Sequence, residues 1–578
     1  MNTTLRILRE HMLRALRSLH RTADAADVSV ASDVSDVSDV SDVSDVSAAS
    51  AARDASATLR SLRRTAHASA ARAASAALAL LAAAFAFAPA PLSAQQWTAS
   101  SGGDWATPAN WSGSSVPNAP GASALFYADI NPGDKGIALS GTVTLGSLIV
   151  SGSTSDSPLT TLSFSDGLLA FNSAGSGAAI WRINNRHNIT VSSSITLASD
   201  LNITLSGNTD GFPSFLNLSG PIDAADNTLT INTGFHTSSA TLSGALNGPG
   251  ASLIKNGAGS LVLANADNSF SGGLLLNAGR TETTISGGNG GGIVIGADGS
   301  AHNGLAGDSA HNNLGAGAVT LSSTVLSGGG GEGATLPVLQ ILTSAANQSV
   351  NLAGSALTIE GGARALVTRA DAAHTGGVFV IDGGTLAGDT AAADPDASGT
   401  LVLSGIDLAF ISGAIAGAPN LLLESGAGAT AAATQRILGD NAGADAAGGG
   451  VGITGLGDIT KTGAGALVLG DDVALLSARN LFLRSAALDL GSTAALELSG
   501  SLVLGVTGAG ALTQTIDARA DGQLSSVATL AVLDGLRTPL GDTYYNIATL
   551  RLNNTDQTLG DLRTGDFAAL KIDLGAPG

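Results

Sequence analysis

Apolar residues recur along this chain in pairs that are separated by a single residue. Four such pairs lie at Leu481/Leu483, Leu488/Leu490, Leu496/Leu498 and Leu502/Leu504. Each pair predicts a short strand with two side chains on one face, because side chains alternate along a strand. The fourth pair begins about 21 residues after the first, and this recurrence marks one structural repeat. The spacing predicts an all-β fold, a right-handed parallel β-helix (β-solenoid) with three short strands per coil of about 21 residues.

The same signature continues over most of the chain, and the residues between pairs suit tight corners. Further pairs are Val143/Leu145, Leu229/Ile231, Leu261/Leu263, Leu274/Leu276, Ile293/Ile295, Val319/Leu321, Leu357/Ile359, Leu401/Leu403 and Leu421/Leu423. We expect Leu483, Leu490, Leu498 and Leu504 to point inward, one from each successive strand, with Leu483 and Leu504 stacked on adjacent coils. Ser492 falls at a corner, where a substitution should cost little.

Glycine divides the chain into two parts. Residues 1–94 contain none of the 77 glycines, which all fall in the rest of the chain. The organisation predicted from this shift is a leader with a low-complexity segment and a signal peptide at 1–94, a Trp-rich N-terminal cap at 95–130 and a β-helix repeat region at 131–578.

The leader has the layout of an export signal. Arginines between Leu59 and Arg72 precede an apolar stretch, Ala73 to Ala88, and small residues lead to a plausible cleavage site after Ala94. A membrane anchor is the alternative, but the run is shorter than the ~20 residues that a span needs. Upstream, Asp-Val-Ser repeats run from Asp33 to Ser47 and favour local duplication or an early start codon over a functional acidic tail.

A longer segment occurs twice. Residues 252–263, SLIKNGAGSLVL, match residues 458–469, DITKTGAGALVL, at an offset of 206. This motif resembles the autotransporter-associated β-strand repeat over about residues 250–490. The resemblance implies a passenger-like β-helix and no particular chemistry. Lys255 and Lys461 hold matching positions in the two copies, which we interpret as a requirement of turn geometry.

Three of the four tryptophans, Trp97, Trp105 and Trp111, fall close together before the first regular pairs. We interpret them as a cap over the exposed strand edge of the first coil. A surface that stacks on carbohydrate is the alternative.

Few segments offer candidate chemistry. The polar run from Trp181 to Asn188 is read as a solvated corner, with a ligand-binding loop as the alternative. His302, Asp308 and His311 lie in a duplicated Gly-rich loop, in which a metal site is the less favoured interpretation. Asp471 and Asp472 follow a repeat strand without the array of oxygen ligands that calcium requires.

The composition disfavours disulfide-stabilised, thiolate-metal and nucleic-acid-binding proteins. With no cysteine there are no disulfides or thiolate metal sites, and the segment after residue 94 carries 16 basic and 37 acidic residues, a net charge of −21 that disfavours nucleic acid. We therefore expect no catalytic residue, cofactor or metal, and no membrane span after the leader. No barrel or sorting tail is recognised up to Gly578, which is compatible with free secretion or an incomplete frame.

The function predicted from these patterns is a secreted or surface-displayed structural or adhesive scaffold that is not an enzyme. Its expected location is the cell exterior, at the outer membrane, after removal of the signal peptide. The expected partners are surface polysaccharide or other cell-surface components. The alternative is a β-helix enzyme that hydrolyses or cleaves polysaccharide, which would need acidic, basic and aromatic side chains gathered in one groove.

Overall fold

A computed structural model describes the chain from Ala94 to Gly575, and the 1–94 leader therefore lies outside the described residues except for Ala94. The segments within this span that are not described are 128–133, 152–159, 185–186, 207–212, 235–236, 266, 279, 285–291, 296–309, 312–313, 315–316, 323–337, 344–348, 354, 361–362, 370–377, 389–398, 425–433, 440–449, 464, 485–486, 507–511, 535 and 538–542.

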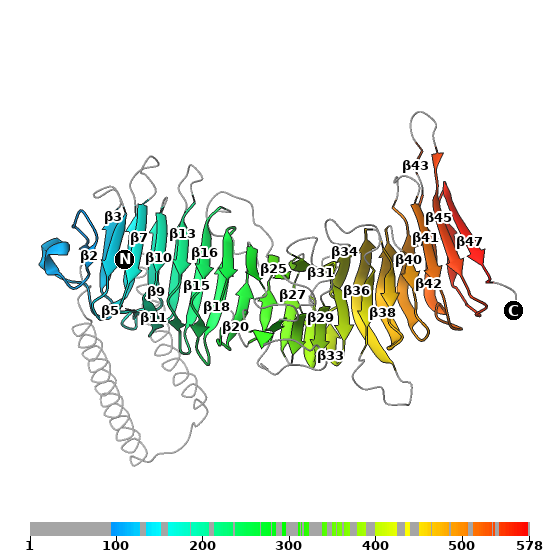
Figure 1. The fold of residues 1–578 in the computed structure, drawn as a ribbon, viewed down its shortest axis with the longest axis horizontal. Helices are drawn as coiled ribbons and strands as arrows, with labels where there is room; N and C mark the ends of the chain where they lie inside the picture. The colour runs from blue at the N-terminus through cyan, green and yellow to red at the C-terminus, as the bar shows by residue number, and fades with distance from the viewer. Residues whose placement is uncertain are drawn as a thin grey trace, which may run out of the picture. The chain divides into compact units, whose positions relative to one another are not determined.

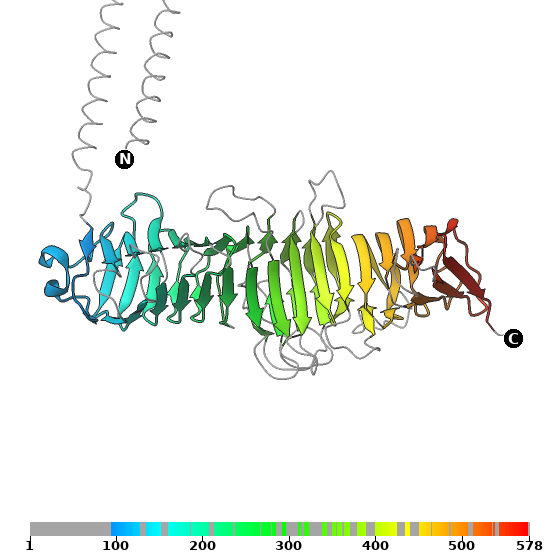
Figure 2. The ribbon, with the colours of Figure 1, turned by 90° about the horizontal axis from the view of Figure 1, so that it is seen from above.

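The described chain is a parallel β-helix, as the apolar pairs predict. Its strands stack in sequence order from the N-terminal to the C-terminal end (Figures 1 and 2), except that Gly292–Ile295 lies between Ala310–His311 and Ser349–Ala353. Among the described residues the helical elements are two 3-10 turns, η1 (Pro108–Asn110) and η2 (Ser112–Ser114). Described residues include no helix that is long and apolar enough to cross a membrane.

A typical coil has three faces, because the chain visits one sheet after another before it returns to the first, although not every coil contributes a described strand to each face. Sheet I contains β1 (Gln95–Gln96), β3 (Ser123–Tyr127), β6 (Ser147–Ser151), β9 (Ala179–Asn184), β12 (Leu201–Ser206), β15 (Thr228–Thr233), β18 (Ser252–Asn256), β20 (Gly273–Leu276), β24 (Val319–Leu321), β27 (Ala356–Ile359), β30 (Gly384–Ala387) and β33 (Gly413–Ala416).

Sheet II is the longest. It contains β2 (Gly103–Asp104), β4 (Lys135–Ala138), β7 (Thr160–Ser165), β10 (His187–Val191), β13 (Phe215–Leu218), β16 (Ser239–Leu242), β19 (Ser260–Leu263), β21 (Arg280–Thr284), β25 (Val338–Thr343), β28 (Arg364–Arg369), β31 (Thr400–Ser404), β34 (Asn420–Glu424), β36 (Val451–Thr462), β38 (Val473–Leu483), β40 (Ala495–Leu504), β42 (Ser526–Val532) and β46 (Asp561–Thr564).

The third face consists of two sheets in succession. Sheet III contains β5 (Thr142–Leu145), β8 (Leu168–Phe171), β11 (Ser194–Leu197), β14 (Ile222–Asp223) and β17 (Leu246–Asn247). Sheet IV contains β22 (Gly292–Ile295), β23 (Ala310–His311), β26 (Ser349–Ala353), β29 (Val378–Asp382), β32 (Asp407–Phe410), β35 (Gln435–Leu438), β37 (Leu467–Leu469), β39 (Leu488–Asp489), β41 (Leu512–Asp517), β45 (Asn546–Arg551) and β47 (Ala568–Asp573). A short antiparallel pair, β43 (Leu536–Arg537) and β44 (Thr543–Tyr544), lies outside these faces.

The compact coil has the predicted length. Ser252 pairs with Gly273, and Leu481 pairs with Leu502, so the residue number rises by the expected 21 in both coils. Other coils are longer, and the one that pairs Arg280 with Val338 is more than twice as long. Individual coils therefore differ in length while the paired strands of neighbouring coils stay parallel. The right-handed winding remains a prediction, based on the general preference of parallel crossovers.

The core consists of the inward residues of each strand, stacked in rows. Leu483, Leu490 and Leu504 are 0% exposed and Leu498 is 2% exposed, which confirms their predicted direction. Leu483 pairs with Leu504 on the adjacent coil, also as predicted. The other pairs are buried too, apart from Ile293/Ile295, of whose side chains nothing is described.

One expectation about these strands is wrong. Leu496/Leu498 and Leu502/Leu504 do not form two strands but lie in a single strand, β40. The backbone stays extended through the corner, and the pairing with β42 shifts register between Leu498 and Ser501. Strands β36 and β38 are similarly long, with register shifts of their own. Two faces of these coils are thus joined by one continuous strand.

Candidate functional sites in the coils

The three tryptophans form one buried aromatic cluster. Trp97, Trp105 and Trp111 are at most 2% exposed, and the rings of Trp105 and Trp111 lie 4.6 Å apart. The indole N–H of Trp111 donates to the carbonyl of Trp105 at 2.7 Å, and that of Trp105 donates to the carbonyl of Pro117 at 3.0 Å. Rings that are enclosed in this way cannot stack on a sugar, so this cluster does not provide the alternative carbohydrate surface.

Both repeat lysines are buried inside the coil, facing the core side of their strands. Lys255 is 0% exposed, and its ammonium donates to the carbonyls of Asn256, Gly257 and Ala278 at 2.9, 2.7 and 3.2 Å. Burial lowers the pKa of Lys255 to about 7. These contacts place the lysine at the turn between β18 and β19, where its ammonium supplies donors to buried backbone oxygens.

Lys461 repeats this arrangement in the second copy of the motif. It is also 0% exposed, its ammonium donates to the carbonyl of Thr462 at 2.6 Å, and burial lowers its pKa to about 8. The matching environments agree with our interpretation that turn geometry explains both lysines.

Asparagines form a ladder beside Lys255. The side-chain amide of Asn256 donates to Asn232 on the preceding coil at 2.8 Å, and Asn277 on the next coil donates to Asn256 at the same distance. A ladder of this kind connects consecutive coils through the amides, since each amide can both donate and accept.

The prediction of a solvated corner from Trp181 to Asn188 is corrected for the residues at both ends of this run, while Asn185 and Arg186 lie outside the described residues. Trp181 and Asn184 belong to strand β9, whereas His187 and Asn188 begin strand β10. Trp181 and His187 are buried with the inward residues of their strands. Alternation along the strand turns these large side chains into the core, so they cannot line an open loop.

The side chains of the less favoured metal site lie outside the described residues. His302 and Asp308 lie outside the described residues, and His311 is described only as part of the backbone of β23. Among the side chains that are described, no group of three or more His, Cys, Asp or Glu residues could hold a metal ion.

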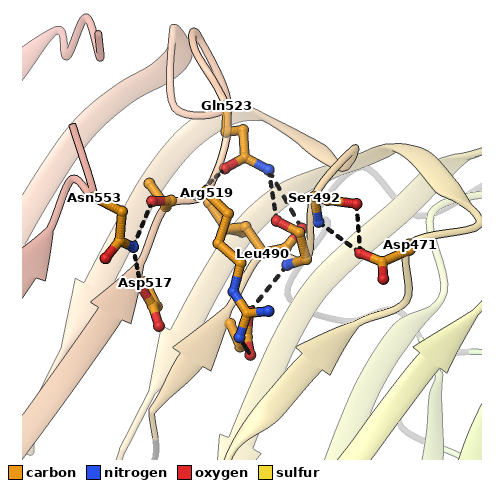
Figure 3. Close-up of polar contacts among 10 residues, drawn as sticks. Asp471, Leu490, Ser492, Asp517, Arg519, Gln523 and Asn553 are labelled. Carbon is orange, nitrogen blue, oxygen red and sulfur yellow. Dashed lines mark hydrogen bonds and ion pairs between the residues drawn. The ribbon is translucent and has the colours of Figure 1, made fainter. Parts of the chain in front are cut away.

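Asp471 and Asp472 form a turn after β37, and the two carboxylates have different environments. One oxygen of Asp471 accepts bonds from the backbone N–H and the hydroxyl of Ser492, both at 2.7 Å (Figure 3). The bond from the Ser492 hydroxyl, and to a smaller extent that from its backbone N–H, hold the pKa of Asp471 below its ordinary value. Both carboxylate oxygens of Asp472 are enclosed and accept no hydrogen bond from the described part of the chain.

The bond between Ser492 and Asp471 is a contact that our expectation for Ser492, a substitution of low cost, did not include. The residue is exposed, as a corner residue should be, but it links two successive coils. A second carboxylate at this position would lie beside that of Asp471 and repel it.

Buried amides are the polar residues that the sequence analysis missed. Gln523 is 2% exposed, and its amide nitrogen donates to the carbonyls of Ala494 at 2.9 Å and Gly491 at 3.2 Å (Figure 3). Its oxygen accepts from the backbone N–H groups of Arg519 and Ala520. Gln435 donates to the carbonyl of Leu403 in β31, and Asn546 donates to the carbonyl of Leu533. The bonds of Gln523 and Gln435 connect neighbouring coils, whereas that of Asn546 to Leu533 lies within one coil.

The side chains of Lys255, Lys461, Asp471 and Gln523 bond to backbone groups or to a neighbouring side chain, whereas the carboxylate of Asp472 accepts no hydrogen bond from the described part of the chain. The bound amides and ammonium groups connect turns to the backbone around them. No family model matches the chain, and neither a curated protein nor a solved structure matches it.

Proposed function

We propose that this protein is a secreted or surface-displayed β-helix scaffold, passenger-like and non-catalytic, with a structural or adhesive role. The observation that supports this proposal most is that buried polar side chains bind the backbone at the corners of the coils. Lys255, Lys461 and Gln523 all donate to backbone carbonyls at coil corners. Residues used in this way keep a long stack of coils in register, which is what a scaffold requires.

The lack of disulfides supports the same role. A chain with no cysteine must obtain its rigidity outside the cell from its backbone ladders and core. The outward side chains of the strands, together with corners of variable length, then offer a surface that can change at little cost to the fold. Surface polysaccharide or other cell-surface components are the proposed partners.

Protease treatment of intact source cells tests the location. We expect the protein to be cleaved in intact cells and to begin at Gln95 when its exported form is sequenced. Full protection in intact cells, with cleavage only after lysis, contradicts the proposed location.

A binding and degradation assay tests the role. The purified protein should be retained on isolated cell envelopes or their polysaccharides without releasing reducing or unsaturated sugars. Release of such products by the native protein contradicts a non-catalytic role and favours a polysaccharide-degrading enzyme.

A further inference from the structure

The outward face of sheet II has an unusual composition where β10, β13 and β16 lie side by side (Figure 1). None of the outward residues on these three strands carries a charge, although the chain has 26 basic and 46 acidic residues. Five of them have a hydroxyl or amide side chain and one is aromatic. They are Asn188, Thr190, Phe215, Asn217, Ser239 and Thr241.

The aromatic residue, Phe215, lies in the middle of this face. It is 37% exposed, whereas Leu216 and Leu218 of the same strand fill the core and are 2% and 1% exposed. Its neighbours across the sheet are Asn188 on the preceding coil and Ser239 on the following one. Phe215 therefore presents an apolar surface with polar groups on either side, which is the composition of a ligand-binding surface.

The polar groups around Phe215 are available to a ligand. Within the described part of the chain, the hydroxyls of Thr190 and Thr241 and the amide of Asn188 bond to no other group. Asn217 accepts one bond, from the hydroxyl of Ser243 at 3.2 Å, and its amide nitrogen keeps its donors. These side chains differ from the buried amides and ammonium groups, which bind the backbone at corners. Together they can both donate and accept hydrogen bonds.

The spacing of these groups is fixed by the backbone. Thr190 pairs with Asn217, and Asn217 pairs with Thr241, so the three side chains form a row along the β-helix. Neighbouring members of such a row are about 4.8 Å apart, and outward residues of one strand are about 6.6 Å apart. A face built on paired strands needs little reordering when a ligand binds, so weak contacts can add up.

The same row changes character farther along sheet II. It continues to Val262 in β19 and, through the following strands, to Leu366, Val402 and Leu422. Hydroxyl and amide side chains at this position are thus a property of the earlier coils and not of the whole sheet. The face around Phe215 is therefore distinct within its own sheet.

The absence of charge on this face decides which partner it fits. An anionic polymer would be repelled by a chain with a net charge of −20 and would meet no basic residue among the six. An uncharged polysaccharide has hydroxyls that both donate and accept, and the C–H face of a sugar ring can lie on an aromatic ring. Its chemistry matches each kind of side chain on this face.

We propose that the outward face of β10, β13 and β16 binds an uncharged polysaccharide, with Phe215 against a sugar ring and the amides and hydroxyls around it bonded to the sugar hydroxyls. The assignment rests on the proposed function, since it locates the polysaccharide contact of that scaffold.

Retention on immobilised polysaccharide tests the face. Polysaccharide extracted from the source cells is separated by anion exchange into an uncharged and an acidic fraction. We expect the native protein to be retained on the uncharged fraction, equally at low and high salt, because no charged group takes part. Phe215→Ala should weaken retention about tenfold. The matched control is Tyr127→Ala, which removes an equally exposed ring from β3 of sheet I and should leave retention unchanged.

Removal of hydroxyls tests the polar contacts. Thr190→Val combined with Thr241→Val removes two outward hydroxyls and keeps the β-branched shape. Thr204→Val combined with Thr230→Val makes the same change on the outward face of sheet I. Only the first pair should lower retention, and equal urea midpoints of the two double variants exclude a loss of folding as the cause.

The outcomes separate this assignment from the proposed function. The assignment is overturned if Phe215→Ala or the double variant of sheet II is retained like the native protein, or if the native protein is retained only on the acidic fraction. Polysaccharide then stays the proposed partner, bound by another surface. Retention of the native protein on neither fraction overturns both the assignment and the polysaccharide partner.

Discussion

Replacing Leu490 by Asp tests the coil register in the C-terminal part. Leu490 is 0% exposed, its backbone N–H donates to the carbonyl of Asp517 at 3.2 Å, and its carbonyl accepts from Gln523 at 3.4 Å. Figure 3 shows the backbone contacts of Leu490, which the substitution leaves in place. It changes only the buried side chain. Its effect therefore reports on the inward direction of the side chain.

The expected cost combines two contributions. Loss of the buried leucine side chain costs about 2–3 kcal/mol. Burying a carboxylate among apolar neighbours adds roughly 2–5 kcal/mol, even when the carboxyl becomes protonated. The sum is about 4–8 kcal/mol at one coil. Since each coil packs mainly on its neighbours, the damage should appear first in the C-terminal coils and spare the tryptophan cluster.

Hydrogen exchange measured by mass spectrometry, together with limited proteolysis, reads out this localisation. Peptides from β39 and β41 should exchange faster in Leu490→Asp, while those that contain Trp97 and Trp111 should match the native protein. Ser499→Asp is the matched control, because Ser499 is exposed in the same coil. The register described above is refuted if exchange and cleavage increase equally in both variants. It is also refuted if the strands around Trp97 and Trp111 are the first to exchange or to be cleaved.

Three further predictions concern polar and aromatic contacts. The folded-state pKa of about 7 at Lys255 lies below the ordinary value of about 10.4 for an unfolded lysine, so the unfolded chain binds more protons between these values and stability should rise from pH 7 towards pH 10. Urea unfolding of Lys255→Met should show a smaller rise over that range. Ser492→Asp should lower the urea midpoint by more than Ser492→Ala, because it sets two carboxylates side by side with Asp471. Trp111→Ala should cost about 3–5 kcal/mol, seen as faster exchange at the N-terminal strands and unchanged exchange near β45.

Much of the fold was predictable because apolar residues recur at every second position in strands that have one face against the core. Leu481 and Leu502 show the compact coil in the sequence, since only short strand segments and short connections separate them. The spacing of apolar pairs does not predict the length of the longer coils. The coil that pairs Arg280 with Val338 is more than twice as long as the compact coil and contains two strands of sheet IV, β22 and β23, so the regular spacing is lost. The sequence analysis also did not predict that one strand, β40, spans two faces. Its Ser-Gly-Ser segment is typical of a turn, although the backbone of such a segment can remain extended.

The buried polar residues could have been located by the same alternation. Leu253 and Lys255 alternate with one outward residue between them on a single strand and share its inward face. His187 shares the inward face of β10 with Ile189 in the same way. A period-two pattern thus predicts that these residues are buried, but it does not name their partners. One carbonyl that accepts from Lys255 belongs to Ala278 on the next coil, and Gln523 reaches back to Leu490 and Ala494 on the preceding one. Such partners depend on coil length, which varies with every insertion, so burial can be read from the local sequence while the contacts require the stacked coils.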